Sequence, residues 1–315
     1  MSEYSVISLF SGIGGIDIAF QLAGFKIIWA NEIDHYACLT YLNNQTNNYL
    51  VEKNISKIDV THIPNADIII AGFPCQSFSI MGLQRGFNDP RGNLFFEIIR
   101  IAESIKPKII FLENVKNLIY HDNGKTFITI YNSLAYLGYS VKYSLLNACT
   151  HGNIPQDRNR TFIVASSEID ILNRFSFPPE IPLNKSINDI IDRSVKHDPV
   201  YYYFNDSIYY DELNKKIKDK TSIYRIDDSG IAKKKYIICP TLKANMGTFH
   251  DRVPIIRDDY GIRKITPYEC LALQGFPPYF KFNNIPLSAA YKQCGNTVCV
   301  PVVERIAKRI RQALD

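Results

Sequence analysis

The chain has 315 residues, enough for one large α/β domain with a smaller lobe or for two modest domains. Hydrophobic and charged contents of 46% and 21% are ordinary for a globular protein, and no apolar stretch approaches the roughly 20 residues that span a bilayer. The formal charge is +5, of which +4 falls between residues 181 and 264. This balance is compatible with a polyanionic partner, although many solvated surfaces share it.

Seven cysteines occur without any CxxC pair. This odd, unpaired set favours reduced thiols in a cytosol, so we expect neither a disulfide framework nor a metal site. The N-terminus lacks a basic segment followed by an apolar one, and no secretory signal is predicted. We therefore expect a cytoplasmic protein without membrane association.

Strand-like and helix-like segments alternate up to about residue 165. The predicted strands are residues 5–10, 26–31, 67–71, 108–112, 140–147 and 161–165, and the predicted helices are near residues 14–23, 34–43, 92–105 and 125–137. This alternation is typical of an α/β fold with a doubly wound, mostly parallel sheet. From about residue 175 it stops, so we predict a small domain at residues 181–284. Residues 1–180, completed by 285–315, would form the catalytic and cofactor-binding domain, with a core-packing helix at residues 302–314.

A glycine-rich turn, Phe-Ser-Gly-Ile-Gly-Gly at residues 10–15, follows the first predicted strand. Glycine allows a tight turn and a close approach to a ligand at the start of the next helix. The second strand is followed by Glu32, where an acid can bind ribose hydroxyls. Each feature alone could be structural, but the pair favours a nucleoside-containing cofactor. Because the turn lacks GxGxxG spacing, an adenosyl cofactor is favoured over a nicotinamide one.

Cys75 and Glu113 each follow an apolar predicted strand. The carboxyl ends of neighbouring parallel strands meet at one edge of a sheet, where open α/β folds keep their chemistry. A lone cysteine is more often a small buried hydrophobe, and a lone glutamate can be a helix cap. Together, a thiol nucleophile and a carboxylic acid suit addition to an electron-poor heterocycle.

Two further segments carry candidate polar contacts. A period-2 pattern would place Gln156, Arg158 and Arg160 on one face, so that two guanidinium groups point together toward a carboxylate, carbonyl or phosphate. A basic surface strand is the ordinary alternative. Residues 293–298, Gln-Cys-Gly-Asn-Thr-Val, are predicted to open the last helix, with the Asn-Thr pair capping it or touching a ligand.

Taken in order, these segments resemble the cytosine-5 DNA methyltransferases, in particular the short bacterial enzymes of restriction–modification systems. The matching motifs stand at residues 10–15, 31–32, 72–79, 89–95, 113–115, 156–160, 263–270 and 291–298. The resemblance covers roughly residues 5–165 and 236–310. It implies a Rossmann-like, S-adenosylmethionine-dependent methyltransferase fold, with a variable target-recognition region in the small domain.

The resemblance implies that S-adenosyl-L-methionine methylates C5 of a cytosine flipped out of duplex DNA. The implied catalytic residues are Cys75 as nucleophile, Glu113 as acid toward N3, and Arg158 and Arg160 toward O2. Cofactor contacts are implied for Phe10, Gly12, Gly14, Gly15, Glu32, Asn54, Pro74, Leu94 and Asn296. DNA contacts are expected from Gln76, Ser79, Arg91, Thr241, Lys243 and Asn245, the last three reading bases. Asn54 replaces an Asp that is common in the family, so an altered adenine contact is expected.

Four alternatives compete with this interpretation. A related family member methylates tRNA, and the separate small lobe favours DNA over RNA. A zinc deaminase would need a second cysteine where Phe78 stands. An inactive DNA-binding protein is disfavoured by the presence of both Cys75 and Glu113, and no residue calls for a nicotinamide-dependent dehydrogenase. The expected partners are double-stranded DNA and, functionally, a restriction endonuclease, and the protein is expected to be monomeric.

Overall fold

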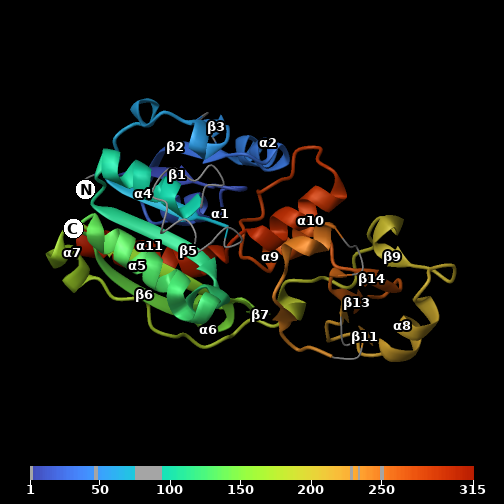
Figure 1. Ribbon diagram of the computed structural model, residues 1–315. Helices are drawn as coiled ribbons and strands as arrows, with labels where there is room; N and C mark the ends of the chain where they lie inside the picture. The colour runs from blue at the N-terminus through green and yellow to red at the C-terminus, as the bar shows by residue number, and fades with distance from the viewer. Residues whose placement is uncertain (1–2, 46–48, 75–93, 228–229, 233–234, 249–251) are drawn as a thin grey trace. The chain divides into compact units, whose positions relative to one another are not determined.

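The computed structural model describes residues 3–45, 49–74, 94–227, 230–232, 235–248 and 252–315. The chain divides into two compact units (Figure 1). The first unit comprises Met1–Leu146, Asn159–Pro179 and Val302–Asp315, and the second unit comprises Asn147–Arg158 and Glu180–Pro301. Residues 147–158 and 285–301 thus group with the small unit in space. The expected functional boundaries placed them with the large domain.

A seven-stranded sheet forms the centre of the first unit, with the order β3-β2-β1-β4-β5-β8-β6. β3, β2, β1, β4 and β5 pair in parallel, and β8 runs antiparallel to β5. The strands are β1 (Ser5–Leu9), β2 (Lys26–Glu32), β3 (Leu50–Glu52), β4 (Ile68–Gly72), β5 (Ile109–Val115), β6 (Ser140–Asn147) and β8 (Asn159–Ser166). The predicted fold class is confirmed. Only β3 lacks a predicted counterpart, because three residues are too few to show a pattern.

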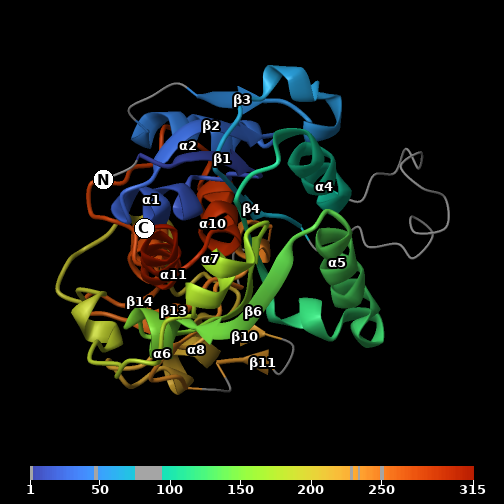
Figure 2. The same cartoon turned by 90° about the vertical axis from the view of Figure 1, so that its left-hand side faces the viewer.

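Helices cover both faces of this sheet. Figure 2 shows α4 and α5 on one face and α1 and α11 on the other. The bounds are α1 (Gly15–Leu22), α2 (His35–Asn44), α4 (Leu94–Ile105), α5 (Lys125–Tyr136), α7 (Ile169–Arg174) and α11 (Val300–Leu314). The predicted helices of this region match α1, α2, α4 and α5 to within two residues. Phe20 of α1 packs edge-on against Phe111 of β5, with the ring centroids 5.2 Å apart. This contact stabilises the packing of α1 on the sheet.

The second unit consists of short elements. β13 (Ile255–Arg257), β14 (Ile262–Lys264) and β9 (Tyr202–Tyr203) form one sheet, while β12 (Cys239–Pro240) pairs in parallel with β7 (Gln156–Asp157). The remaining strands are β10 (Ile226–Asp227) and β11 (Gly230–Ile231). The helices are α6 (Ala148–Gly152), α8 (Tyr210–Lys216), α9 (Pro267–Ala272) and α10 (Leu287–Asn296), with a 3₁₀ turn η9 (Ala244–Gly247). A separate apolar cluster that includes Leu213, Ile217 and Ile255 forms its core.

The prediction that residues 293–298 open the last helix is wrong. Residues 293–296 end α10, Thr297 is its C-cap, and α11 begins at Val300. Thr297 is extended, with ψ at 173°, and Pro301 stands in the first turn of α11, where its missing N–H is no loss. No helix in the described part of the chain has both the length and the apolar character needed to cross a bilayer.

Candidate active site

The glycine-rich turn joins β1 to α1 through left-handed backbone positions. Phe10, Gly12 and Gly14 have φ values of 54°, 56° and 85°. A non-glycine residue in this region is uncommon, and such strain tends to gather at functional sites. A Cβ built on Gly12 would meet no atom within 4 Å, so the turn is open at this point. Gly15 opens α1, and the first N–H groups of that helix point toward the turn.

Glu32, at the end of β2, fixes the turn. Its Oε2 accepts a hydrogen bond from the Gly12 N–H at 2.8 Å, and its Oε1 accepts from the N–H groups of Ile33 and Asp34. Oε2 has a second lone pair that can accept from a ligand hydroxyl. The acid expected to bind a ribose therefore also holds the glycine turn in place.

Asp17, which the sequence interpretation did not single out, lies fully buried in the first turn of α1. Its carboxylate accepts from the Ser8 hydroxyl of β1 and the Tyr41 hydroxyl of α2, both at 2.9 Å. Burial raises the pKa of Asp17 to about 6, and the two hydroxyl hydrogen bonds oppose this rise. The network joins three elements directly beneath the glycine turn. In the sequence, the one sign of this buried network is an acidic residue, Asp17, among the apolar residues of the predicted first helix.

Asn54 caps the 3₁₀ turn that follows β3. Its Oδ1 accepts from the Ser56 N–H at 3.1 Å and from the Ser56 hydroxyl at 3.0 Å. The side-chain carbonyl that was expected to meet an adenine amine is thus already engaged. Asn31 fixes the same region, since its Nδ2 donates to the carbonyls of Val51 and Lys53.

β4 and β5 bring two predicted site segments to one edge of the sheet. Gly72 of β4 stands in register with Glu113 of β5, and Glu113 Oε2 lies 3.6 Å from where a Gly72 Cβ would be. The next residue along β5, Asn114, donates from Nδ2 to the Phe73 carbonyl at 2.8 Å. The chain leaves β4 through Phe73 and the exposed Pro74. Cys75, Gln76, Ser79 and Arg91 lie outside the described residues, which resume at Leu94, the first residue of α4.

Glu113 forms an ion pair with Arg160 of the adjacent strand β8. Arg160 Nε lies 3.1 Å from Glu113 Oε1, and Glu113 is only 8% exposed. Burial lowers the pKa of Arg160, while the neighbouring carboxylate raises it. The structure thus joins two of the predicted catalytic residues.

The prediction that Arg158 and Arg160 point together as a fork is wrong, because the two side chains have different partners. Arg158 is 2% exposed, and it donates to the carbonyls of Leu242, Gly295 and Thr297. The period-2 pattern fails here because the Arg158 N–H bonds back to the Gln156 carbonyl at 2.9 Å, a tight turn that interrupts the strand between β7 and β8.

The expected base-reading residues lie around η9 in the second unit. The Thr241 hydroxyl donates to the Asp157 carbonyl, Lys243 is exposed, and Asn245 lies in η9. Asn296, the last residue of α10, is exposed between buried neighbours. Its amide can therefore reach a ligand while the backbone on either side is held.

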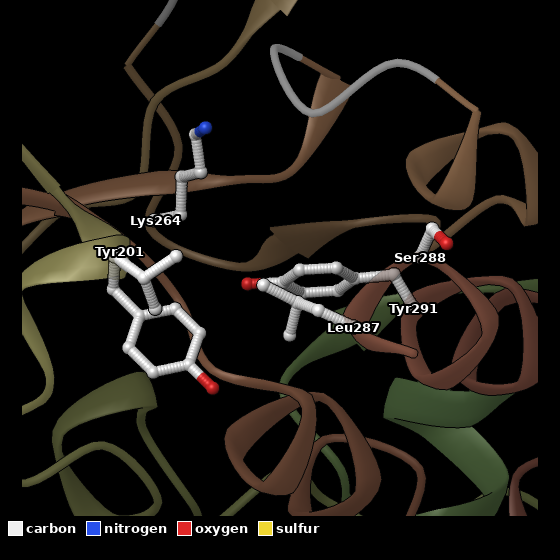
Figure 3. A pocket seen from close by; sticks show the side chains of 6 residues that line it. Tyr201, Lys264, Leu287, Ser288 and Tyr291 are labelled. Carbon is white, nitrogen blue, oxygen red and sulfur yellow. The ribbon is translucent and has the colours of Figure 1, made fainter. Parts of the chain in front are cut away.

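A pocket of about 300 Å³ lies in the second unit, lined in part by residues of α10. Figure 3 shows the aromatic rings of Tyr201 and Tyr291 and the Lys264 side chain around it. The lining residues are Val200, Tyr201, Lys264, Leu287, Ser288 and Tyr291. None of these six is a predicted site residue.

Comparison with known proteins identifies the family. Residues 4–312 match the C-5 cytosine-specific DNA methylase family. The chain is 43% identical over 312 residues to the type II methyltransferase M.Bsp6I of Bacillus sp. (strain RFL6), covering 98% of this chain and 99% of that protein. It is 38% identical to M.HaeII of Haemophilus aegyptius, covering 100% of this chain and 95% of the relative.

Solved structures show the same fold. The Entamoeba histolytica methyltransferase EhMeth superposes with a TM-score of 0.75 at 20% identity, covering 100% of both chains. At that identity the likeness concerns the fold alone, whereas the sequence matches span nearly the whole chain. The chain belongs to the C-5 cytosine-specific DNA methylase family and is a DNA cytosine-5 methyltransferase.

Proposed function

We propose that this enzyme transfers the methyl group of S-adenosyl-L-methionine to C5 of a flipped-out cytosine within a short, specific duplex sequence. Its biological role is to protect host DNA in a restriction–modification system, because relatives that it matches over nearly its whole length are type II methyltransferases. The observation that carries the mechanism is the buried ion pair between Glu113 and Arg160. Glu113 stands in register with Gly72 at the end of β4, and Gly72 precedes Cys75 by three residues.

The residues around the glycine turn fit an adenosyl cofactor. The bound cofactor supplies an electrophilic methyl group on a sulfonium. The open turn at Gly12, with Phe10, Gly14 and Gly15, would hold this cofactor, and Glu32 would accept hydrogen bonds from its ribose hydroxyls. The further contacts that we assign are Asn54, Pro74, Leu94 and Asn296. Because the Asn54 carbonyl already caps a turn, its contribution is weaker than that of an aspartate.

Cys75 is the nucleophile of this proposal. Its thiolate would add to C6 of cytosine, which makes C5 an enamine carbon able to attack the sulfonium methyl, with S-adenosylhomocysteine as the leaving group. Glu113 hydrogen-bonds or protonates N3, and Arg160 orients Glu113 and binds O2. A base then removes the C5 proton, and Cys75 leaves by β-elimination.

The other cysteines are poor nucleophiles. All cysteines in the described part of the chain are buried. Burial raises the pKa of the Cys38, Cys149, Cys239 and Cys270 thiols above their usual value. Since the thiolate is the reactive form, this burial leaves them inert near neutral pH.

The substrate is double-stranded DNA in the cytoplasm, and the enzyme acts as a monomer beside a cognate endonuclease. Thr241, Lys243 and Asn245 read bases, while Gln76, Ser79 and Arg91 contact the DNA near the flipped cytosine. RNA methylation is not favoured, because the family and the named relatives are DNA methylases and type II methyltransferases.

Bisulfite sequencing after incubation with S-adenosylmethionine tests this function. Plasmid DNA of varied sequence and a tRNA pool are treated in parallel, with Cys75→Ser as the inactive control. We expect one cytosine in one recurring duplex sequence to be protected, and no protection of tRNA. Protection of tRNA alone, or no protected cytosine with enzyme shown to bind its cofactor, would refute the proposal.

A further inference from the structure

Gln156 and Arg158 together hold the segment that carries the proposed base-reading residues, residues 241–247, here called the reading segment. Gln156 is fully buried, and its Oε1 accepts from the Leu242 N–H at 3.2 Å. Arg158 donates to the Leu242 carbonyl at 2.9 Å. Both backbone groups of Leu242 are therefore bonded to side chains that come from one tight turn.

The same Arg158 guanidinium also binds the end of α10. It donates to the Gly295 carbonyl at 3.1 Å and to the Thr297 carbonyl. The last carbonyls of a helix have no partner within the helix and carry partial negative charge, so a buried cation there is stabilising. These two carbonyls flank Asn296, whose own side chain is exposed.

Backbone packing reinforces this link at two glycines. A Cβ on Gly295 would lie 2.1 Å from the Lys243 carbonyl carbon, and a Cβ on Gly247 would lie 2.2 Å from the Ser288 carbonyl oxygen. The reading segment therefore lies directly against α10 at both ends of that helix. Because the two backbones are in close contact, a displacement of α10 would displace the reading segment, and the reverse also holds.

We propose that Arg158 is a positioning residue that couples cofactor binding at Asn296 to base reading by residues 241–245. The inference rests on the proposed function. In this proposal Arg158 positions two protein segments and does not bind the cytosine O2. By linkage, a cofactor that orders residues 295–297 also orders the reading segment, and specific DNA in turn strengthens cofactor binding.

Hydrogen–deuterium exchange on the full-length enzyme tests this coupling, with S-adenosylhomocysteine as the probe. In the wild type, the probe should slow amide exchange in residues 241–247. Arg158→Lys keeps the charge but cannot reach three carbonyls, so it should lose this slowing while still binding the probe, about tenfold more weakly. Arg257→Lys is the matched control, because Arg257 also bonds a carbonyl of the second unit, that of Ile217. It should behave as the wild type.

Kinetics supply a second measurement. Arg158→Lys should raise KM for the methyl donor and methylate near-cognate sequences, whereas a purely structural defect would lower kcat without changing the sites used. Unchanged exchange of residues 241–247 in the probe-bound wild type would overturn the coupling, as would slowing that persists in a folded Arg158→Lys. If that variant does not fold, the wild-type exchange decides alone. No binding of the probe to the wild type would overturn the proposed cofactor site as well.

Discussion

Glu32 serves both the structure and the proposed cofactor site. Its carboxylate accepts a hydrogen bond from the Gly12 N–H, and we propose that it also accepts from the ribose hydroxyls of the cofactor. We therefore expect Glu32→Ala to weaken S-adenosylmethionine binding by about 1–3 kcal/mol in calorimetric titration. Glu52, in register with Glu32 on the neighbouring strand, is the matched control, and Glu52→Ala should bind normally. Tight NAD binding without binding of the methyl donor would refute the site.

Glu113 provides a second prediction at this scale. Glu113→Gln keeps the shape of the side chain but removes the acid, so kcat should fall by about 10²–10⁴-fold, the usual contribution of a general acid. Binding of the methyl donor should be nearly unchanged, because no proposed cofactor contact is lost. A kcat within tenfold of the wild type in single-turnover assays would show that Glu113 is not the acid.

Individual residues differed in how far the sequence could place them. Glu113 and Glu32 directly follow or end apolar strands, so parallel pairing alone predicts the sheet edge at which they emerge. The partners of Arg158 could not be predicted, since Leu242 and Gly295 lie 84 and 137 residues away along the chain. No local pattern encodes contacts at such separation.

At the scale of elements, Asp17 joins β1, α1 and α2 beneath the glycine turn. Its pKa is raised to about 6 in the folded protein. A carboxyl group whose pKa is raised by folding stabilises the folded protein at pH values below its unfolded-state pKa. This stabilisation is lost as the pH rises through the folded-state pKa of about 6. Relative to the wild type, Asp17→Asn should gain about 1–2 kcal/mol of unfolding free energy between pH 5 and pH 8 in urea titrations. Parallel stability curves for the two proteins over that range would contradict this account.

Long, strongly patterned elements were predictable, and short ones were not. α4 spans twelve residues with one apolar face, and its bounds came within two residues of the prediction. The break between α10 and α11 could not be predicted, because Arg158 binds the Gly295 and Thr297 carbonyls there, and the local sequence does not show these contacts. The second unit, built from strands of two or three residues, has too little periodicity for prediction.

At the scale of the whole molecule, the proposal assigns sequence reading and methyl-donor binding to different residues. Substituting Thr241, Lys243 or Asn245 by alanine should change which cytosines bisulfite sequencing finds methylated, while the affinity for the donor measured without DNA stays intact. Lys235, which pairs with Asp219 at 2.8 Å elsewhere in the second unit, is the control, and Lys235→Ala should leave the site unchanged. Loss of donor binding with an unchanged methylated sequence would mean that these residues do not read DNA.

The most direct test of the central claim is covalent trapping at Cys75. Duplex DNA with 5-fluorocytosine at the methylated position is incubated with the enzyme and S-adenosylmethionine, because fluorine blocks the final elimination. Peptide mapping should place a stable adduct on Cys75, and Cys75→Ser should form none. An adduct that persists in Cys75→Ser, or that maps to Cys149 or Cys294, would contradict the mechanism.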